Sequence, residues 1–527
     1  MLSGRSPPDS GLFNTGELVQ RQTIHNTLWL LVAIAILWWF VSSLDFGGPT
    51  ADANRELPSL EFSEEQIEVI RTYLAAEPWD PQSTNEASSS RDKMCSDLRQ
   101  LAAGLKRCWA YAEEKKVHHG IDVDTIADQH SAQITDDTTP DEFGRILQAF
   151  IAAIQDGHAH AKLATPHSYG FYSLPFDLLP VAEGYAAVDW PGIDSPVPKG
   201  SLIEEIGGES IQSLITARAR FVSSSTQQAR TSLVLKYHFL FSHKEIPVRF
   251  RDPKGELHEK ICQMVLPSEE FHAAKVPSQE IEWRVIQDSV GYLRLPTFQP
   301  DNTAWKQTAD ADRGTFLEPT FEKLRHAFET LNEHQHLVLD LRGNEGGTDM
   351  LGQFLAGKLL PADTPYYRIE SKYSPEVADL YQTAGAARLE SGWGQSHESP
   401  VTTEQDVEPY NGRMYVLIDD GCFSTTDNFL ACLRDMRPNT TFVGRPTQGG
   451  TGASRFLLKL KYSQAEVCCC TILVKSPNGH VIEGRGSQPD IPVTWSQENI
   501  VQGTDADLEA ALQRIVATGT EKTRDNH

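Results

Sequence analysis

Short apolar runs alternate with helical stretches from residue 285 onward, and this alternation limits the possible folds more than any other feature of the chain. Runs with the length of strands occupy residues 290–295, 336–341, 414–418 and 441–443. Apolar residues recur at helical spacing within 316–331 and 428–437. Strands separated by helices build a layered α/β domain whose sheet is largely covered. We therefore expect an α/β layer structure in the second half of the chain.

The preceding residues differ in character. Residues 59–155 have mainly helical periodicity, and a short strand is expected at 159–163. Residues 173–265 contain alternating strands, among them 178–181, 185–189 and 246–251. A chain of 527 residues is too long for one hydrophobic core, so several domains are expected. The net charge of −25, without a cluster of Lys and Arg, excludes a nucleic-acid partner.

One segment has the properties of a membrane anchor. Residues 27–44 carry no charge and are just long enough to span a bilayer. Arg5 and Arg21 precede this segment, whereas only Arg55 follows it closely, so the N-terminus is expected in the cytoplasm and the rest of the chain outside it. The alternative is a cleaved signal peptide with a cleavage site near 51–53, but the polar stretch before the apolar run is long for a signal.

The eight cysteines do not indicate a metal centre or a disulfide-dense scaffold. Cys468, Cys469 and Cys470 lie in a strand-like run, where alternate side chains face opposite sides and cannot all serve one bridge. The chain has no C-x-x-C pair and no His-rich ligand spacing, so we expect neither a structural metal nor a cofactor.

The string MYVLIDDGCFSTTD at 414–427 places Ser424 where a buried strand turns into a helix. The amides at the start of the helix, together with the helix dipole, can stabilise an oxyanion beside this serine. The alternative is an ordinary capping box formed by residues 424–427, which any helix start can use. A second strand, in LDLRGNEGG at 339–347, ends at Gly346 and Gly347, whose backbone can turn an amide towards a ligand.

These segments resemble the C-terminal-processing, or tail-specific, serine protease family when they are taken with three further strings in the same order. The further strings are GYLRLPTF at 291–298, GRPTQG at 444–449 and GSQPDIPV at 486–493. The resemblance implies a ClpP/crotonase-like layered α/β catalytic domain with Ser424 as nucleophile. It assigns the oxyanion donors to the Thr425 amide and to the turn at Gly346 and Gly347. KGSLIEEIGGESI at 199–211 similarly resembles part of a PDZ domain.

One departure from the family pattern concerns the base. Processing peptidases with a Ser-Lys dyad have lysine after G-x-x-T-x-G, where this chain has Gly450. A serine needs a base to become a good nucleophile, and histidine is suited to this because its pKa lies near neutral pH. The string DGHAH at 156–160 resembles the segment of the lysine-free, tricorn-like branch. This resemblance implies His158 as general base and Glu483 as its supporter, with His160 as the rival base.

The sequence thus predicts seven regions and one leading function. The regions are a cytoplasmic tail (1–26), a transmembrane anchor (27–44), a linker (45–58), a helical region (59–167), a PDZ-like domain (168–268), the catalytic domain (269–500) and a C-terminal helix and tail (501–527). The leading function is a membrane-anchored serine peptidase that cleaves extracytoplasmic (periplasmic or extracellular) proteins or peptides through an acyl-enzyme. The alternative is a catalytically inactive peptide- or ligand-binding protein on the same fold. The oligomeric state is left open.

Overall fold

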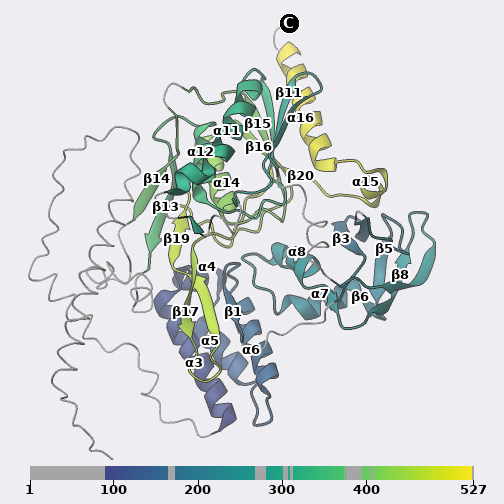
Figure 1. Ribbon diagram of the computed structural model, residues 1–527, viewed down its shortest axis with the longest axis vertical. Helices are drawn as coiled ribbons and strands as arrows, with labels where there is room; N and C mark the ends of the chain where they lie inside the picture. The colour runs from purple at the N-terminus through teal and green to yellow at the C-terminus, as the bar shows by residue number, and fades with distance from the viewer. Residues whose placement is uncertain are drawn as a thin grey trace, which may run out of the picture.

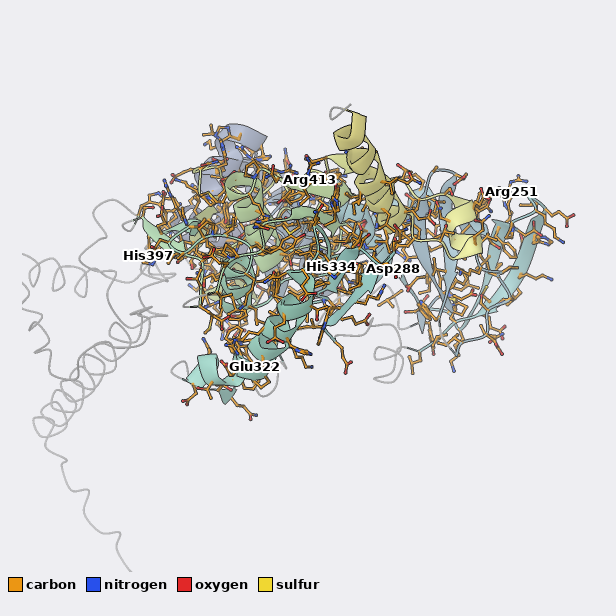
Figure 2. The ribbon with its side chains drawn as sticks, turned by 90° about the horizontal axis from the view of Figure 1, so that it is seen from above. Arg251, Asp288, Glu322, His334, His397 and Arg413 are labelled. Atoms are coloured by element: carbon orange, nitrogen blue, oxygen red, sulfur yellow. The ribbon has the colours of Figure 1, made fainter. Side chains whose placement is uncertain are left out.

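The computed structural model describes residues 89–524, apart from 164–171, 191, 267–279, 301–304, 306, 309–311, 373, 375–392, 394–395 and 405–406. It comprises an α/β domain, a helical region below it and a β-rich domain to one side (Figure 1). Seen from above, Arg251 of the β-rich domain and His397 of the α/β domain lie at opposite sides of the molecule (Figure 2). Within the described residues, no helix combines the length and apolarity needed to cross a bilayer, and residues 27–44 lie outside them.

A six-stranded sheet forms the centre of the α/β domain. Its order is β10-β11-β12-β15-β16-β20, and only the β10–β11 pair is antiparallel. The strands are β10 (Glu282–Ile286), β11 (Val290–Arg294), β12 (His336–Asp340), β15 (Arg413–Ile418), β16 (Thr440–Gly444) and β20 (Ile491–Pro492). This sheet confirms the α/β layers expected from the alternating pattern.

Helices cover both faces of this sheet (Figure 1). The helices α11 (Arg313–Leu331), α12 (Asp349–Gly357) and α14 (Thr425–Met436) contribute to the core on one face, and α16 (Ala506–Arg524) packs on the other. Successive residues of β15 alternate between the two cores: Val416 belongs to the first and Leu417 to the second. Both are fully buried, as expected for a strand covered on both sides.

The helical region does not form its core alone. It consists of α3 (Ser90–Cys108), α4 (Ala112–His119), α5 (Val123–Ser131), α6 (Pro140–Ala153) and the strand β1 (His160–Lys162). β1 pairs with β18 (Glu466–Cys470), which pairs with β17 (Ser454–Lys459). Leu458 and Val467 of this hairpin are buried in the helical core. Part of the 269–500 region predicted as the catalytic domain therefore packs with the helices.

The remaining elements form two further sheets and the β-rich domain. The strands β13 (Pro365–Ser371), β14 (His397–Pro400) and β19 (Ile472–Lys475) make one small sheet. The β-rich domain contains β2 (Tyr172–Ser173), β3 (Phe176–Val181), β4 (Gly184–Asp189), β5 (Leu202–Ile206), β6 (Glu209–Ser210), α7 (Ile211–Ala219), α8 (Gln227–Tyr237), β7 (Leu240–Phe241), β8 (Glu245–Arg251) and β9 (Leu257–Gln263). α15 (Gln497–Gln502) packs against β4 through Ile500 and Ala186.

All eight cysteines are free, and seven of them are buried. Cys108 Sγ at the end of α3 lies 3.5 Å from Cys469 Sγ on β18. Cys468 and Cys470 alternate with Cys469 along the same strand, so their side chains lie on the opposite face from that of Cys469.

Candidate active site

The candidate site lies where two neighbouring parallel strands end. β12 and β15 are paired in parallel, so the turns that follow them meet at one edge of the sheet. The Phe423 amide donates to Asn344 O at 3.1 Å, and Thr426 Oγ1 donates to the same carbonyl at 2.8 Å. These bonds join the turn that contains Ser424 to the turn that contains Gly346 and Gly347.

Ser424 adopts a strained backbone conformation. Its φ and ψ are 60° and −121°, a region that residues with a side chain rarely occupy. The Ser424 amide donates to Gly450 O at 2.9 Å, and α14 begins at the next residue. The Ser424 side chain makes no capping bond to the helix. The capping-box interpretation of residues 424–427 is therefore wrong, and the hydroxyl is left to face the cleft, as on a nucleophile elbow.

His158 provides the imidazole that faces Ser424. Its Nε2 lies 3.1 Å from Ser424 Oγ, across 266 residues of sequence. The ring stacks on Phe423, with 4.3 Å between centroids and 23° between planes. His160 is directed elsewhere: it is exposed, and its Nδ1 lies 3.2 Å from His158 O. The structure thus brings together Ser424 and His158, and not Ser424 and His160.

The carboxylate whose charge acts on the His158 ring is Asp156. Asp156 is fully buried, accepts the His158 amide at 2.8 Å and accepts Trp109 Nε1 at 2.7 Å. A carboxylate oxygen of Asp156 and a ring nitrogen of His158 lie within 4.8 Å of one another. His158 Nδ1 is buried and has no hydrogen-bond partner within the described residues. Burial lowers the pKa of His158, and the negative charge of Asp156 partly offsets this effect.

Glu483 does not bond to His158, although the resemblance implied that it would support this base. Its Oε2 accepts the Thr451 amide at 3.0 Å, and its Oε1 lies 3.0 Å from Lys115 Nζ. Lys115 also donates to Gln155 O, immediately before Asp156. Glu483 therefore reaches the His158 turn through Lys115, a residue of α4. Lys115 could not be identified from the sequence as its partner, because it comes from a different domain.

The Lys115–Glu483 pair yields a prediction about stability. Their side chains are 1% and 0% exposed, and burial raises the pKa of Glu483 to about 7. Above that pH, Lys115→Met leaves a buried carboxylate without its cation, which costs about 3 kcal/mol of unfolding free energy. Below it the carboxyl takes up a proton, so the variant should recover stability as the pH falls.

Urea unfolding of the unmodified protein and of Lys115→Met at about pH 8 and about pH 5.5 measures the difference in their unfolding free energies. The double variant Lys115→Met/Glu483→Gln is the control, because it removes both charges together. An equal loss of stability in the Lys115→Met variant at the two pH values contradicts the assignment.

The two glycines after β12 have different surroundings. The Gly346 amide donates to Asn344 Oδ1 at 2.9 Å, so it is not available as an oxyanion donor. The Gly347 and Thr425 amides have no acceptor within the described part of the chain. A Cβ on Gly346 would lie 2.5 Å from Phe423 O, so glycine is required for the close approach of the two turns. Thr425 Oγ1 donates to Gly347 O at 3.0 Å, and the Phe298 amide donates to Gly346 O at 3.0 Å, which orients the peptide group that carries the Gly347 amide.

The space that a lysine side chain at position 450 would need is occupied by other side chains. A Cβ on Gly450 would lie 2.0 Å from Phe423 Cε2 and 2.6 Å from Ser225 Oγ. The Phe423 ring that supports His158 therefore excludes any side chain at 450. Ser225 Oγ also accepts the Gly157 amide at 2.9 Å, which connects the β-rich domain to the turn of the base.

Asp427 organises the loop that carries Gly450. It is fully buried in the first turn of α14 and accepts the Gly449 and Gly450 amides at 3.0 and 3.2 Å. Thr447 Oγ1 donates to its other oxygen at 2.5 Å. Burial raises the pKa of Asp427 to about 8. Asp427 therefore bonds to the loop at 447–450 and does not take part in the capping box that the sequence suggested.

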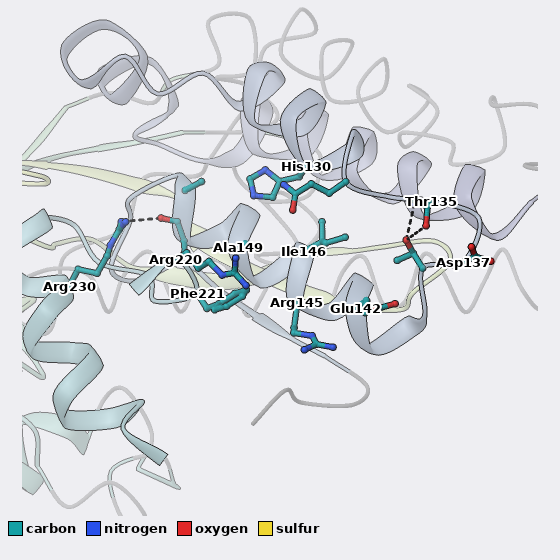
Figure 3. A pocket seen from close by; sticks show the side chains of 14 residues that line it. His130, Thr135, Asp137, Glu142, Arg145, Ile146, Ala149, Arg220, Phe221 and Arg230 are labelled. Atoms are coloured by element: carbon teal, nitrogen blue, oxygen red, sulfur yellow. Dashed lines mark hydrogen bonds between the residues drawn. The ribbon is translucent and has the colours of Figure 1, made fainter. Parts of the chain in front are cut away.

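Two pockets lie beside Ser424 and His158, and a third lies farther away. One, of about 310 Å³, is lined by residues that include Ser424, His158, Asp349, Arg455 and Val474. Another, of about 420 Å³, is lined by residues that include Gly157, His160 and Phe423. The third, of about 710 Å³, lies beside α6 and is lined by none of the site residues. Arg145, Arg220 and Arg230 line it (Figure 3).

Comparison with known proteins places this arrangement in a family. Residues 289–493 match the model of peptidase family S41. This region belongs to peptidase family S41. The S41 domain contains Ser424, the glycine turn and Glu483, and it makes the chain a serine-type peptidase. His158 precedes the matched region, so its position beside Ser424 is a finding of the structure. No curated protein matches the chain.

Solved structures show the same fold over most of the described chain. Mature CPAF complexed with lactacystin is 16% identical, with a TM-score of 0.64 over 81% of this chain and 98% of that chain. Mature CPAF is 17% identical, with a TM-score of 0.59 over 78% of this chain and 94% of that chain. At this identity the similarity concerns the fold, including the helical region outside the S41 domain.

Proposed function

We propose that this S41 peptidase cleaves peptide bonds through an acyl-enzyme formed on Ser424, with His158 as general base. The observation that carries this proposal is the 3.1 Å distance between His158 Nε2 and Ser424 Oγ. His158 takes the hydroxyl proton as Ser424 Oγ attacks the scissile carbonyl, and then gives that proton to the leaving amine. Water, activated by the same imidazole, hydrolyses the ester. Burial keeps His158 neutral and able to accept a proton near neutral pH by lowering its pKa.

The oxyanion of the tetrahedral intermediate needs donors that are not already bonded. The Thr425 and Gly347 amides meet this condition, and both belong to turns that the Asn344 bonds hold together. Thr425 also stands at the start of α14, where the helix dipole favours negative charge. Gly346 contributes by allowing the close approach of these turns.

A serine-reactive fluorophosphonate probe tests the assignment of the nucleophile. We expect one labelled residue, Ser424, and loss of labelling in Ser424→Ala. His158→Ala should label much more slowly, because a serine at its ordinary pKa is a poor nucleophile. Labelling of Ser424→Ala at the wild-type rate would place the nucleophile elsewhere.

The environment of His158 predicts the acid limb of the pH profile. Because burial lowers the pKa of His158, kcat/KM should rise with pH through a midpoint below the ordinary histidine value of about 6.5. The profile is measured with a fluorogenic peptide, using Glu483→Gln as the control. Glu483 does not touch the imidazole, so its replacement should not move the limb. A limb above about 6.5 contradicts a buried histidine base.

The substrate proposal rests on the pocket and on the β-rich domain. The pocket at Ser424 is lined by the apolar Ile369, Ile472 and Val474 and by the polar Asp349, Asn428 and Arg455, so it offers both apolar and polar contacts to a substrate side chain. We propose that the 168–268 region is PDZ-like and takes the C-terminal tail of a protein by adding it as a strand. Its edges are β3 and β9. Together with the S41 motifs, these features support tail-specific processing by a lysine-free, tricorn-like Ser-His peptidase.

We further propose that residues 27–44 anchor the enzyme in a membrane, with the S41 domain outside the cytoplasm. The support is the uncharged run and the arginine asymmetry around it. A reporter fused to the C-terminus should be active outside the cytoplasm, and the protein should stay with the membrane after a salt wash. Recovery of a soluble form that starts near Asn54 would replace the anchor with a cleaved signal peptide.

A further inference from the structure

The side chains of Asp156, His158 and Cys470 form a cluster of three different chemical groups. A carboxylate oxygen of Asp156, a ring nitrogen of His158 and Cys470 Sγ all lie within 4.8 Å of one another. Cys470 Sγ lies 3.8 Å from Asp156 Oδ1. Nε2 of the ring faces Ser424, so Nδ1 is the nitrogen left for this cluster, and it is buried without a partner among the described residues.

The fold builds this cluster from segments far apart in the sequence. Asp156 and His158 lie in the turn between α6 and β1, and β1 pairs with β18 so that His160 is opposite Cys468. Cys470, two residues further along β18, therefore lies beside the turn, with its side chain fully buried. The ligand set has no recognisable spacing, which explains why the sequence indicates no metal.

The composition of the cluster matches a soft divalent cation. One carboxylate, one imidazole and one thiolate are zinc ligands, and three protein ligands leave a fourth position for water. Zn–S and Zn–O bonds of about 2.3 and 2.0 Å separate sulfur and oxygen by about 3.5 Å in a tetrahedron, close to the distance found here. The two negative ligands cancel the charge of the cation, so the loaded site is neutral within a buried environment.

We propose that Asp156, His158 and Cys470 form an inhibitory site for Zn²⁺ or a similar soft cation. Binding releases the thiol proton of Cys470, forms the metal–sulfur bond and places the cation on His158 Nδ1. A metal on Nδ1 removes the proton from that nitrogen, so the single ring proton must reside on Nε2. Nε2 then donates to Ser424 Oγ and cannot accept its proton. The bound cation therefore prevents His158 from acting as the base, while the imidazole stays beside Ser424.

Binding is tested first, independently of activity, on the full chain with Ser424→Ala. We expect Co²⁺ to bind at one per chain with a thiolate-to-cobalt charge-transfer band, and Zn²⁺ to displace it with loss of the band. Adding Cys470→Ala should abolish the band, whereas adding Cys469→Ala should not, because Cys469 faces Cys108. No band, or an unchanged band without Cys470, overturns the site even if the peptidase assignment is correct.

Inhibition is then measured with a peptide substrate on enzyme that retains Ser424. Zn²⁺ should inhibit reversibly, with recovery on addition of a chelator. The reference for each variant is its own activity without Zn²⁺. The quantity compared between variants is the Zn²⁺ concentration that halves this activity. This concentration should rise at least about tenfold in Cys470→Ala and stay unchanged in Cys469→Ala. Equal sensitivity of Cys470→Ala and the unmodified enzyme overturns the proposal. This arm rests on the proposed function, whereas the cobalt arm does not.

Discussion

Replacement of His158 by alanine is expected to reduce kcat/KM nearly as much as replacement of Ser424, by about 10⁴-fold to 10⁶-fold. The two side chains form one unit, with Nε2 and Oγ 3.1 Å apart. Without the imidazole, Ser424 keeps its proton, and no lysine can take over at 450 because the Phe423 ring occupies that space. The kcat/KM of the double variant Ser424→Ala/His158→Ala should therefore be nearly the same as that of either single variant.

The matched control is His160→Ala. This histidine lies two residues away and is exposed, and its Nδ1 faces the His158 carbonyl instead of Ser424. Its removal should change kcat/KM by less than about tenfold. Activity is measured with a fluorogenic peptide, and thermal unfolding shows that each variant is folded. A His158→Ala enzyme with near-normal kcat/KM, or a His160→Ala enzyme that is inactive, contradicts the proposed base.

The central part of this site could be predicted from the sequence because it depends on local chain order. A strand, a tight turn and a helix start place Ser424 at a sheet edge, and a second strand ending in glycines belongs beside it if the two strands are parallel neighbours. The strands observed at β12 and β15 agree with the predicted runs to within one residue at each end. The helix expected at 316–331 begins three residues earlier, at Arg313.

The surroundings of His158 could not be predicted because they depend on packing between segments. Lys115 comes from α4, and its charge attracts Glu483 away from the base to which the resemblance assigned it. Phe423 is one residue before the nucleophile, and nothing in its spacing indicates that its ring stacks on His158. The position of the β17–β18 hairpin in the sequence predicts that it belongs to the catalytic domain, yet its apolar side chains pack in the helical core.

The second large effect is expected from Asp156→Asn. A carboxylate oxygen of Asp156 lies within 4.8 Å of a ring nitrogen of His158, and its charge stabilises the imidazolium that forms during the reaction. Two unit charges about 5 Å apart interact by about 3 kcal/mol at an effective dielectric constant of about 20. We therefore expect Asp156→Asn to lower kcat/KM by roughly a hundredfold. Because Asp156 raises the pKa of His158, its neutralisation should also move the acid limb to lower pH.

The movement of the limb separates an electrostatic role from a structural one. The side-chain amide that Asp156→Asn introduces would face Trp109 Nε1 and the His158 amide, both of which donate to Asp156, so thermal unfolding must accompany the kinetics. A loss of activity from misfolding alone would leave the limb in place. Glu483→Gln is the control with the opposite expectation: lower stability and an unmoved limb, because Glu483 contacts Thr451 and Lys115. If Glu483→Gln moved the limb and Asp156→Asn did not, the supporting role would return to Glu483.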